Sequence, residues 1–217
     1  MNLWRNNSVH PGWPRPVGPL RVSAGLVGLR PVRMRDATLW SRIRLADRSL
    51  LEPWEPTAEM DWVVRHSVSA WPAMCSGLRA EARRGRMLPY AIEVNGVFCG
   101  QLTIGNVTHG ALRSAWIGYW VSSAVTGRGV ATAALALGLD HCFSAVMLHR
   151  VEATVRPENA ASRAVLAKVG FREEGLLRRY LDIDGAWRDH LLVAQTVEET
   201  QGPVASALVK KGLAQWP

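Results

Sequence analysis

The 217-residue chain has few cysteines, no long apolar run and no metal-binding pattern, and each absence removes a class of protein. Cys75, Cys99 and Cys142 are odd in number and widely spaced, which argues against a disulfide framework or a zinc site and favours a reducing compartment. No apolar run approaches the roughly 20 residues of a membrane span, and the first residues lack the apolar region of a secretory signal. We therefore expect a cytoplasmic, metal-free protein with no membrane association.

The charge balance is basic, with 26 Lys and Arg residues against 18 Asp and Glu residues and a net charge of +8. The basic residues are spread along the chain rather than gathered in one segment, so direct binding of nucleic acid is the weaker interpretation. A polyphosphate cofactor or an acidic protein surface would use the same charge. A hydrophobic content of 48% over this length predicts one sizeable globular domain with short extensions.

The two ends of the chain are predicted to lie outside this domain. Residues 1–23 are rich in proline and lack an apolar period, which predicts an extended arm that Trp4 and Trp13 either hold against the domain or leave exposed. Residues 24–198 form the predicted domain. Residues 199–217 form a tail with at most a loose helix.

In the first third of the domain, the sequence predicts one strand and two helical regions. Residues 20–32 have the composition of a strand, and Asp36 is a suitable N-cap for a helix that ends near residue 49. A second helical region follows over residues 57–86, and Pro72 is expected to divide it into two pieces.

A run of antiparallel strands is predicted next. Asn95-Gly96 is a strong hairpin signal, and it lies between strand-like segments over residues 89–94 and 97–107. Residues 114–121, SAWIGYWV, alternate in side-chain type and continue the antiparallel series.

A glycine loop follows that last strand, within residues 121–138, VSSAVTGRGVATAALALG. Gly127 and Gly129 permit a sharp turn and a close approach of backbone N–H groups to a ligand. The helix behind them, over about residues 129–147, is apolar on nearly every face, which predicts that it is buried. Its N-terminus adds unpaired amides and a positive dipole end, so an anion such as phosphate is favoured. A turn without a ligand is the alternative for the loop taken alone.

A second motif lies downstream. After a predicted strand over residues 151–155, Pro157 opens a helix over about residues 159–168, and Gly170 ends it. A final hairpin, with its last strand over residues 187–197, completes the domain.

This order of elements resembles the GNAT superfamily of N-acetyltransferases over about residues 25–197. TGRGVA at residues 126–131 matches the superfamily's phosphate loop, and NAASRAVLAKVGF at residues 159–171 matches its second motif. The segments IGYWV, Asn-x-x-Ser and YLDIDGAWRDH are similar to the RimJ/RimL type, which acetylates the N-termini of ribosomal proteins. The resemblance implies an α+β fold with a mixed, mostly antiparallel sheet of about six or seven strands, flanked by about four helices and splayed open where acetyl-CoA binds.

The resemblance also implies a cofactor site in that opening. The pyrophosphate of acetyl-CoA would lie on the loop amides, and its pantetheine arm beside the backbone of the preceding strand. Asn159 would hydrogen-bond the pantetheine or a nearby backbone group. Thr126 stands where the family usually has Gln or Arg, and we expect rearranged contacts because backbone amides carry most of the phosphate binding. The residues expected to bind acetyl-CoA are Trp120, Val121, Ser122, Thr126, Gly127, Arg128, Gly129, Val130, Ala131, Thr132, Asn159 and Ser162.

The implied reaction is direct attack of an amine on the thioester, which gives a tetrahedral intermediate and a thiolate leaving group without a cysteine nucleophile. Ser162 is the implied acid for the thiolate, and a serine that only satisfies helix amides is the alternative. The resemblance does not identify the general base, because Arg179 stands where the family has its candidate glutamate. Glu93 acting through water, and Tyr119 if it faces the cleft, are the candidates. A surface charge is the alternative for Glu93.

The acceptor is expected to meet aromatic and acidic side chains. Trp54 and Trp62 would form the wall of its site, and Asp182 would bind the cationic amine. The alternatives are a core position for Trp62 and a role for Asp182 that only shapes the last hairpin. His149 and His190 are interpreted as structural.

Three functions are consistent with these motifs. The first is acetyl-CoA-dependent acetylation of a protein N-terminal α-amine, with ribosome association as a further expectation. The second is acetylation of a small amine such as an antibiotic or a polyamine. The third is a non-catalytic acyl-CoA-binding or ribosome-associated module, which Arg179 keeps open. The sequence leaves both a monomer and a homodimer open.

Overall fold

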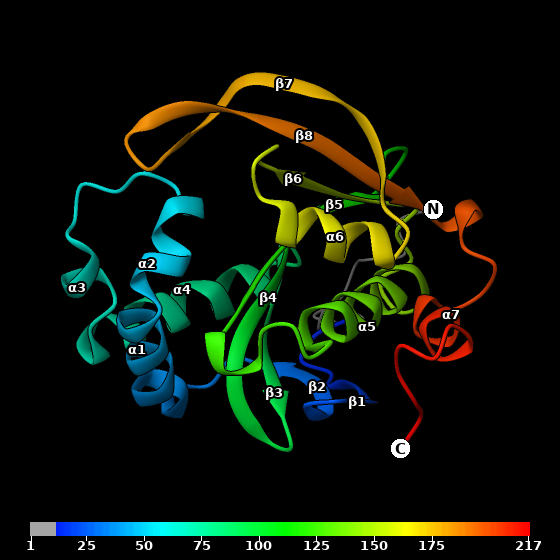
Figure 1. The fold of residues 1–217 in the computed structure, drawn as a ribbon, viewed down its shortest axis with the longest axis horizontal. Helices are drawn as coiled ribbons and strands as arrows, with labels where there is room; N and C mark the ends of the chain where they lie inside the picture. Colours follow the sequence, from blue (N-terminus) through cyan, green and yellow to red (C-terminus); the bar gives the residue numbers. More distant parts are fainter. Residues whose placement is uncertain (1–11) are drawn as a thin grey trace.

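The computed structural model describes residues 12–217, and in this range eight strands form one mixed sheet (Figure 1). Their order is β1-β2-β3-β4-β5-β6-β8-β7, and only β5 and β6 run parallel. The predicted α+β fold with a mostly antiparallel sheet is confirmed, with eight strands instead of six or seven. The strands are β1 (Val17–Val22), β2 (Gly25–Pro31), β3 (Met87–Val94), β4 (Val97–Thr108), β5 (Ser114–Val121), β6 (Arg150–Val155), β7 (Arg172–Ile183) and β8 (Ala186–Thr196).

Seven α-helices lie in the same described range, where the sequence predicts about four. The difference arises because α2 and α3 are single turns and because part of the predicted tail is helical. No helix of residues 12–217 is long and apolar enough to cross a membrane. The helices are α1 (Ala37–Ala46), α2 (Arg48–Leu51), α3 (Trp62–Arg65), α4 (Trp71–Arg83), α5 (Val130–Ser144), α6 (Ala160–Lys168) and α7 (Val204–Lys210).

Each face of the sheet has its own hydrophobic core. On one face, Leu135 of α5 is fully buried in a cluster that includes Tyr90 of β3. On the other face, Trp40 of α1 and Trp71 of α4 pack in a cluster with Ala91 of β3. Because successive residues of a strand face opposite sides, β3 contributes to both cores. The apolar helix α5 is buried as its composition predicts.

The hairpin around Asn95-Gly96 is confirmed. Both residues have positive φ values, 50° and 80°, as a turn of this kind requires. The Asn95 side-chain oxygen also accepts a hydrogen bond from the Leu26 N–H at 2.9 Å, which ties the turn to β2. The next strand, β5, has the predicted bounds.

The sheet opens between β5 and β6, because these two strands pair only over their first residues. Their register runs from Ser114 opposite Arg150 to Trp116 opposite Glu152. Beyond that point β5 stays paired with β4 as far as Val121, while β6 stays paired with β8. The predicted opening is therefore confirmed.

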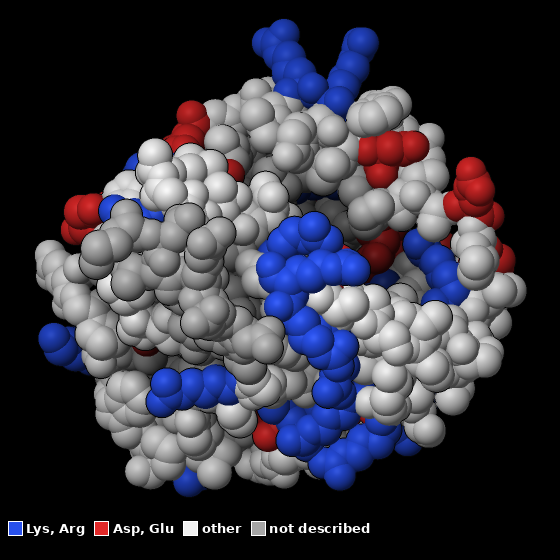
Figure 2. Space-filling view, turned by 180° about the vertical axis from the view of Figure 1, so that it is seen from behind, with Lys and Arg blue, Asp and Glu red and all other residues white. Residues whose placement is uncertain are grey.

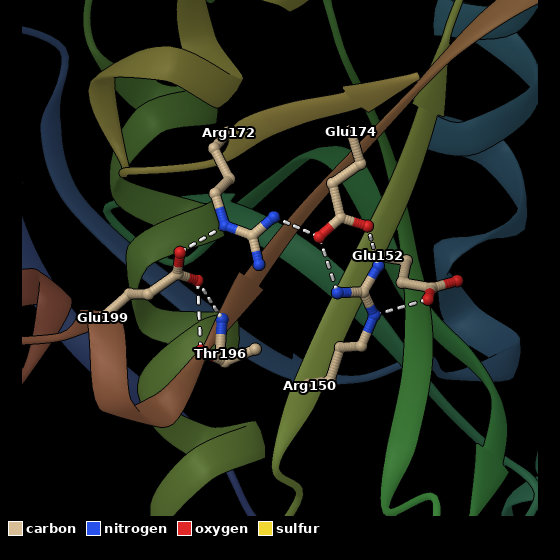
Figure 3. A network of polar contacts seen from close by, with 6 residues as sticks. All are labelled: Arg150, Glu152, Arg172, Glu174, Thr196 and Glu199. Carbon is tan, nitrogen blue, oxygen red and sulfur yellow. Dashed lines mark hydrogen bonds and ion pairs between the residues drawn. The ribbon is translucent and has the colours of Figure 1, made fainter. Parts of the chain in front are cut away.

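A network of charged side chains joins β6, β7 and β8 near the closed end of this opening (Figure 3). Arg150 donates to Glu152 at 2.6 Å and, through its other nitrogens, to Glu174 of β7. Arg172 donates to Glu174 and to Glu199, whose carboxylate also accepts from the backbone at the end of β8. The network holds three strands together where β6 leaves β5, although exposed ion pairs contribute little individually.

Both ends of the described chain pack onto the domain, which differs from the boundaries predicted at residues 23 and 198. Trp13 is buried, and β1 adds an edge strand to the sheet. Leu208 of α7 is buried in the same core as α5, and a β-bridge joins the last residues to β1. Residues 1–11, with Trp4 of the predicted arm, lie outside the described residues.

One local prediction in the first third of the domain is wrong, and two hold only in part. Residues 20–32 belong to two strands, because the chain turns at Ser23 and Ala24. Asp36 is the N-cap residue of α1, but its side chain makes no capping bond, and its buried carboxylate instead accepts two hydrogen bonds from the Arg30 guanidinium, at 2.8 and 2.9 Å. The second helical region is divided as predicted, but the break precedes Pro72, which lies in the first turn of α4, where its fixed φ and missing N–H are tolerated.

Candidate active site

A cavity of about 230 Å³ lies where β5 and β6 diverge, and it is termed the cleft below. Its lining comes from β5, β6, the first turns of α6, β8 and the 3-10 turn Glu52–Trp54. The lining residues are Trp54, Ile117, Gly118, Tyr119, Ala153, Thr154, Val155, Arg156, Asn159, Ser162, Leu166 and His190.

Tyr119 and Ser162 meet in the cleft. Their hydroxyl oxygens are 3.0 Å apart, and the Tyr119 hydroxyl also donates to the Ser162 backbone carbonyl at 3.4 Å. Tyr119 therefore faces the cleft and not the opposite side of β5. Burial raises the pKa of Tyr119 to about 12, so the phenol stays protonated near neutral pH. A neutral phenol paired with a serine hydroxyl can supply a proton to a leaving group.

The N-terminus of α6 orients Ser162. Asn159 is the N-cap, and its side-chain oxygen accepts a hydrogen bond from the Ser162 N–H at 3.0 Å. Asn159 therefore bonds a nearby backbone group, which is one of the two roles expected for it. Because Asn159 already satisfies this N–H, the Ser162 hydroxyl is not needed for capping and pairs with Tyr119.

The glycine loop presents backbone N–H groups between β5 and α5. Gly127 and Gly129 have φ values of 75° and 83°, in the left-handed region that other residues rarely adopt. A Cβ on Gly129 would lie 3.2 Å from Val22 of β1. The Thr126 hydroxyl donates within the loop, to the Ser122 carbonyl at 3.2 Å. The first-turn amides of α5 have no carbonyl partner inside the helix, so they and the helix dipole can bind an anion.

Side chains hold this loop from two sides. Asp47, which follows α1, accepts hydrogen bonds from the Ser123 N–H at 2.8 Å and from its hydroxyl at 2.6 Å. The Ser23 hydroxyl donates to the Arg128 carbonyl at 3.0 Å, and the Arg128 guanidinium donates back to the Ser23 carbonyl at 3.3 Å. The loop is thus tied to α1 and to the turn between β1 and β2.

Alternate backbone groups of β5 face the cleft. The Ser122 N–H donates to a β4 carbonyl at 2.7 Å, and a Cβ on Gly100 of β4 would lie 2.3 Å from the Trp120 carbonyl oxygen. Both backbone groups therefore point to β4. Since backbone groups alternate in direction along a strand, Tyr119 and Val121 direct theirs to the open edge. Of the three strand residues expected to bind a ligand through their backbone, the geometry favours Val121.

The opposite side of the cleft is made by side chains. Arg156 follows β6, donates to the Pro53 carbonyl at 3.0 Å, and places its guanidinium carbon 5.2 Å from the centre of the Trp54 ring. Trp54 keeps 39% of its surface exposed, so its ring is accessible at the cleft. Residues 119–132, of which Tyr119 lines the cleft, are termed the loop side of the site below, and Trp54, Arg156 and His190 the rim side.

The predicted cofactor residues from Trp120 to Thr132 do not line the cleft, and three of the residues predicted for catalysis or acceptor binding also lie outside it. Glu93 pairs with Arg30 at 2.8 Å and does not line the cleft. Trp62 is buried and donates its ring N–H to a backbone carbonyl of α1 at 2.9 Å, and it borders a second cavity. Asp182 of β7 accepts a hydrogen bond from the Thr57 hydroxyl at 2.6 Å.

Two titratable residues at the cleft were not predicted as site residues, and a third unpredicted residue, Asp47, supports the loop. Arg156 directly precedes Pro157 of the second motif, and His190 ends the segment YLDIDGAWRDH, so adjacency to a motif was the available signal. His190 is buried and lines the cleft, where burial lowers its pKa. Asp47 supports the loop from a distant helix and carried no signal in the sequence.

Within residues 12–217, no group of three or more His, Cys, Asp or Glu side chains could hold a metal ion. Cys75, Cys99 and Cys142 are free and buried, and burial raises the pKa of each thiol. None of the three lines the cleft.

The splayed sheet, the glycine loop and the hydroxyl pair together define an acyl-transferring class of protein. Residues 27–172 match the family model described as the acetyltransferase (GNAT) domain, which spans more than half of the chain. The chain therefore belongs to the GNAT family of acetyltransferases.

Individual relatives are similar over different lengths. A solved structure of Mycobacterium smegmatis RimJ in complex with CoA-disulfide is 74% identical, with a TM-score of 0.95, and the match covers 96% of this chain and 100% of that chain. The Escherichia coli ribosomal protein uS5-alanine N-acetyltransferase is 28% identical over 87% of this chain and 96% of the relative. YjcK of Bacillus subtilis, described as a probable N-acetyltransferase, is 41% identical over 44% of this chain, and the match spans 52% of that relative.

Proposed function

We propose that the protein transfers the acetyl group of acetyl-CoA to the N-terminal α-amine of a ribosomal protein. The observation that carries this proposal is the Tyr119–Ser162 hydroxyl pair, 3.0 Å apart, beside the open edge of β5. The 74% identity to RimJ, whose structure is described with CoA-disulfide, supports the donor. The similarity to an enzyme named for the alanine of ribosomal protein uS5 supports the acceptor class.

The residues of this chain fit acetyl-CoA, which supplies the activated acetyl group. The amides of residues 127–132 would hold its phosphates, because they lie at a helix N-terminus with no Cβ on either loop glycine. The outward backbone groups of Tyr119 and Val121 would pair with the amides of its pantetheine arm, as an added strand does at a sheet edge. Ser162, supported by Tyr119, would donate the proton that the sulfur requires.

The charges of the cleft favour a protein N-terminus over a polyamine or a lysine side chain. None of the described residues that line the cleft is a carboxylate, and Arg156 brings a positive charge to it. A polyamine would place further positive charges there without a partner. An α-amine has a pKa of about 7.7–8.0 against about 10.4 for lysine, so it loses its proton far more easily.

We also propose that the basic surface brings the enzyme to the ribosome. Figure 2 shows Lys and Arg side chains gathered in a stripe on the face opposite to that of Figure 1. At the end of α4, three exposed arginines (Arg83, Arg84 and Arg86) accompany Glu81, which pairs with two of them. RNA phosphates attract such a surface in a salt-dependent way, so co-sedimentation with ribosomes should weaken as salt rises. A ribosomal acceptor would place the protein in the cytoplasm.

Thiol release from acetyl-CoA tests the proposed reaction. The panel contains an Ala-initiated peptide with the N-terminal sequence of uS5, the same peptide with an acetylated N-terminus and a free lysine, spermidine and an aminoglycoside. We expect turnover of the first peptide alone. Turnover of spermidine or the aminoglycoside alone would replace the proposal with a small-amine enzyme. Binding of CoA without turnover of any amine would leave a non-catalytic binding module.

A further inference from the structure

The described lining of the cleft contains one side chain that can accept a proton near neutral pH. Its titratable members are Tyr119, Arg156 and His190. Burial keeps Tyr119 protonated, and a guanidinium does not lose its proton in proteins. Arg179, at the position of the glutamate that the family resemblance implies, is exposed, and the lining does not include it. His190 is the remaining group.

The backbone orients the His190 ring. Nδ1 lies 3.1 Å from the Arg188 carbonyl oxygen, so Nδ1 carries the proton and Nε2 is left as the acceptor. The residue is 4% exposed, and the Tyr180 ring packs against it edge-on at 5.9 Å between ring centres. His190 directly precedes Leu191 in β8, and Leu191 pairs with Val155 at the end of the ladder that joins β8 to β6. Its position is therefore set by the sheet and not by a loop.

We propose that His190 Nε2 is the general base that removes a proton from the acceptor's α-ammonium group; this inference rests on the proposed function. The freed lone pair of the amine nitrogen forms the C–N bond to the acetyl carbon, and the C–S bond breaks with its electrons on sulfur. The nitrogen loses a second proton as the amide forms, and Ser162 gives its hydroxyl proton to the sulfur. The proton from the nitrogen replaces the one that Ser162 gave up, so the serine hydroxyl is restored. The proton on His190 returns to water.

The groups around His190 keep it neutral. Burial is the largest cause of its lowered pKa, and the backbone hydrogen bond to Arg188 opposes it. Of the charged groups near the ring, Arg156 lowers the pKa, while Glu158 and Asp189 raise it. Tyr180 of β7 adds a ring contact. The base form is thus present below pH 6.5, where an acceptor α-amine is still mostly protonated.

The pH dependence of kcat/KM tests the proposal in a way that a structural role would not reproduce. With His190 as base, the acid limb of the wild-type profile has its midpoint below 6.5. In His190→Asn the amide can still donate to the Arg188 carbonyl, but Nε2 is lost. The midpoint of the acid limb should then move to the acceptor's own pKa of about 7.7–8.0. The kcat/KM of the variant should be about 100-fold below that of wild type at pH 6.5, and the difference should be smaller at pH 9. An unchanged acid limb in His190→Asn would overturn the proposal.

A matched control and a second measurement complete the test. His149→Asn removes a partly exposed histidine that pairs with Glu198 at 3.0 Å outside the cleft, and its profile should match wild type. If the wild-type enzyme prefers another amine, the proposed acceptor is wrong. The pH dependence of kcat/KM measured with that amine, for wild type and His190→Asn, then still decides whether His190 is the base.

The second measurement needs no turnover. In ¹⁵N-histidine-labelled protein with CoA, a free Ala-initiated peptide should shift the His190 Nε2 resonance, and the acetylated peptide should not. No shift with the free peptide at a concentration where it binds would also contradict the proposal.

Discussion

The loop side and the rim side of the site are built in opposite ways. Residues 119–132 form one continuous segment that presents mainly backbone groups; Asp47 supports it, and the Tyr119 hydroxyl is its one side-chain group paired with Ser162. The rim side joins Trp54, Arg156 and His190 from three distant segments, and it presents side chains. A backbone site depends on shape, whereas a side-chain site depends on the identity of each residue. The loop side can therefore bind the donor despite Thr126, and the rim side can set the acceptor.

The largest effect on acetyl-CoA binding is expected from a substitution at a glycine of the loop side. Gly129→Glu adds a Cβ 3.2 Å from Val22 at a φ of 83° and places a carboxylate among the amides proposed to bind phosphate. We expect acetyl-CoA affinity to fall at least about 100-fold, because an ion at a helix N-terminus loses its site and meets a like charge. Isothermal titration calorimetry with CoA measures this loss.

Two further variants separate charge from backbone strain in that experiment. Gly129→Ala keeps the strain and the Val22 contact without the carboxylate, so it should bind CoA more tightly than Gly129→Glu. Gly202→Glu introduces the same carboxylate at another positive-φ glycine with open space around it, and it should bind CoA as wild type does. Wild-type affinity in a folded Gly129→Glu protein would refute the phosphate site.

A smaller effect, confined to the chemical step, is expected at the junction of the two sides. Ser162→Ala removes the hydroxyl that lies 3.0 Å from the Tyr119 hydroxyl, and kcat should fall about 100-fold with CoA affinity unchanged. If the two hydroxyls act as one relay, Ser162→Ala combined with Tyr119→Phe should lose little more than the stronger single variant. Rapid-quench measurement of a single turnover isolates the step. A wild-type rate in Ser162→Ala would exclude it as the acid.

The smallest effect is expected on the rim side. Trp54→Ala removes the ring that lies 5.2 Å from the Arg156 guanidinium carbon and borders the cleft. KM for the peptide should rise about 3- to 10-fold, in proportion to one aromatic contact, while CoA affinity stays unchanged. Trp187→Ala, at a tryptophan that is 65% exposed and outside the cleft lining, is the matched control. If Trp54→Ala lost as much affinity for CoA as for the peptide, the assignment of the donor to the loop side and the acceptor to the rim side would be wrong.

The continuous parts of the molecule were predictable because their signals are local. The hairpin at Asn95-Gly96 depends on two adjacent φ values, and the burial of α5 follows from its composition over four turns. The order of the two motifs predicted the splayed sheet and the acetyltransferase family. Differences arose where a tertiary partner overrode a local preference, as when Arg30 engaged the carboxylate of Asp36, which was expected to make the capping bond of α1, and that of Glu93, one of the two candidate bases.

The sequence by itself determined the hairpin at Asn95-Gly96, the sharp turn of the glycine loop and the burial of α5, because turn conformation and side-chain periodicity act between residues that are close in the chain. The fold and the class of reaction followed from the resemblance of its two motifs to the GNAT superfamily. Only the tertiary structure decided that Tyr119 faces Ser162 and that Arg156 holds the Trp54 segment. The same holds for His190, which reaches the cleft through the pairing of β8 with β6. These are contacts between side chains from different strands and helices, and their geometry exists only after the sheet has assembled.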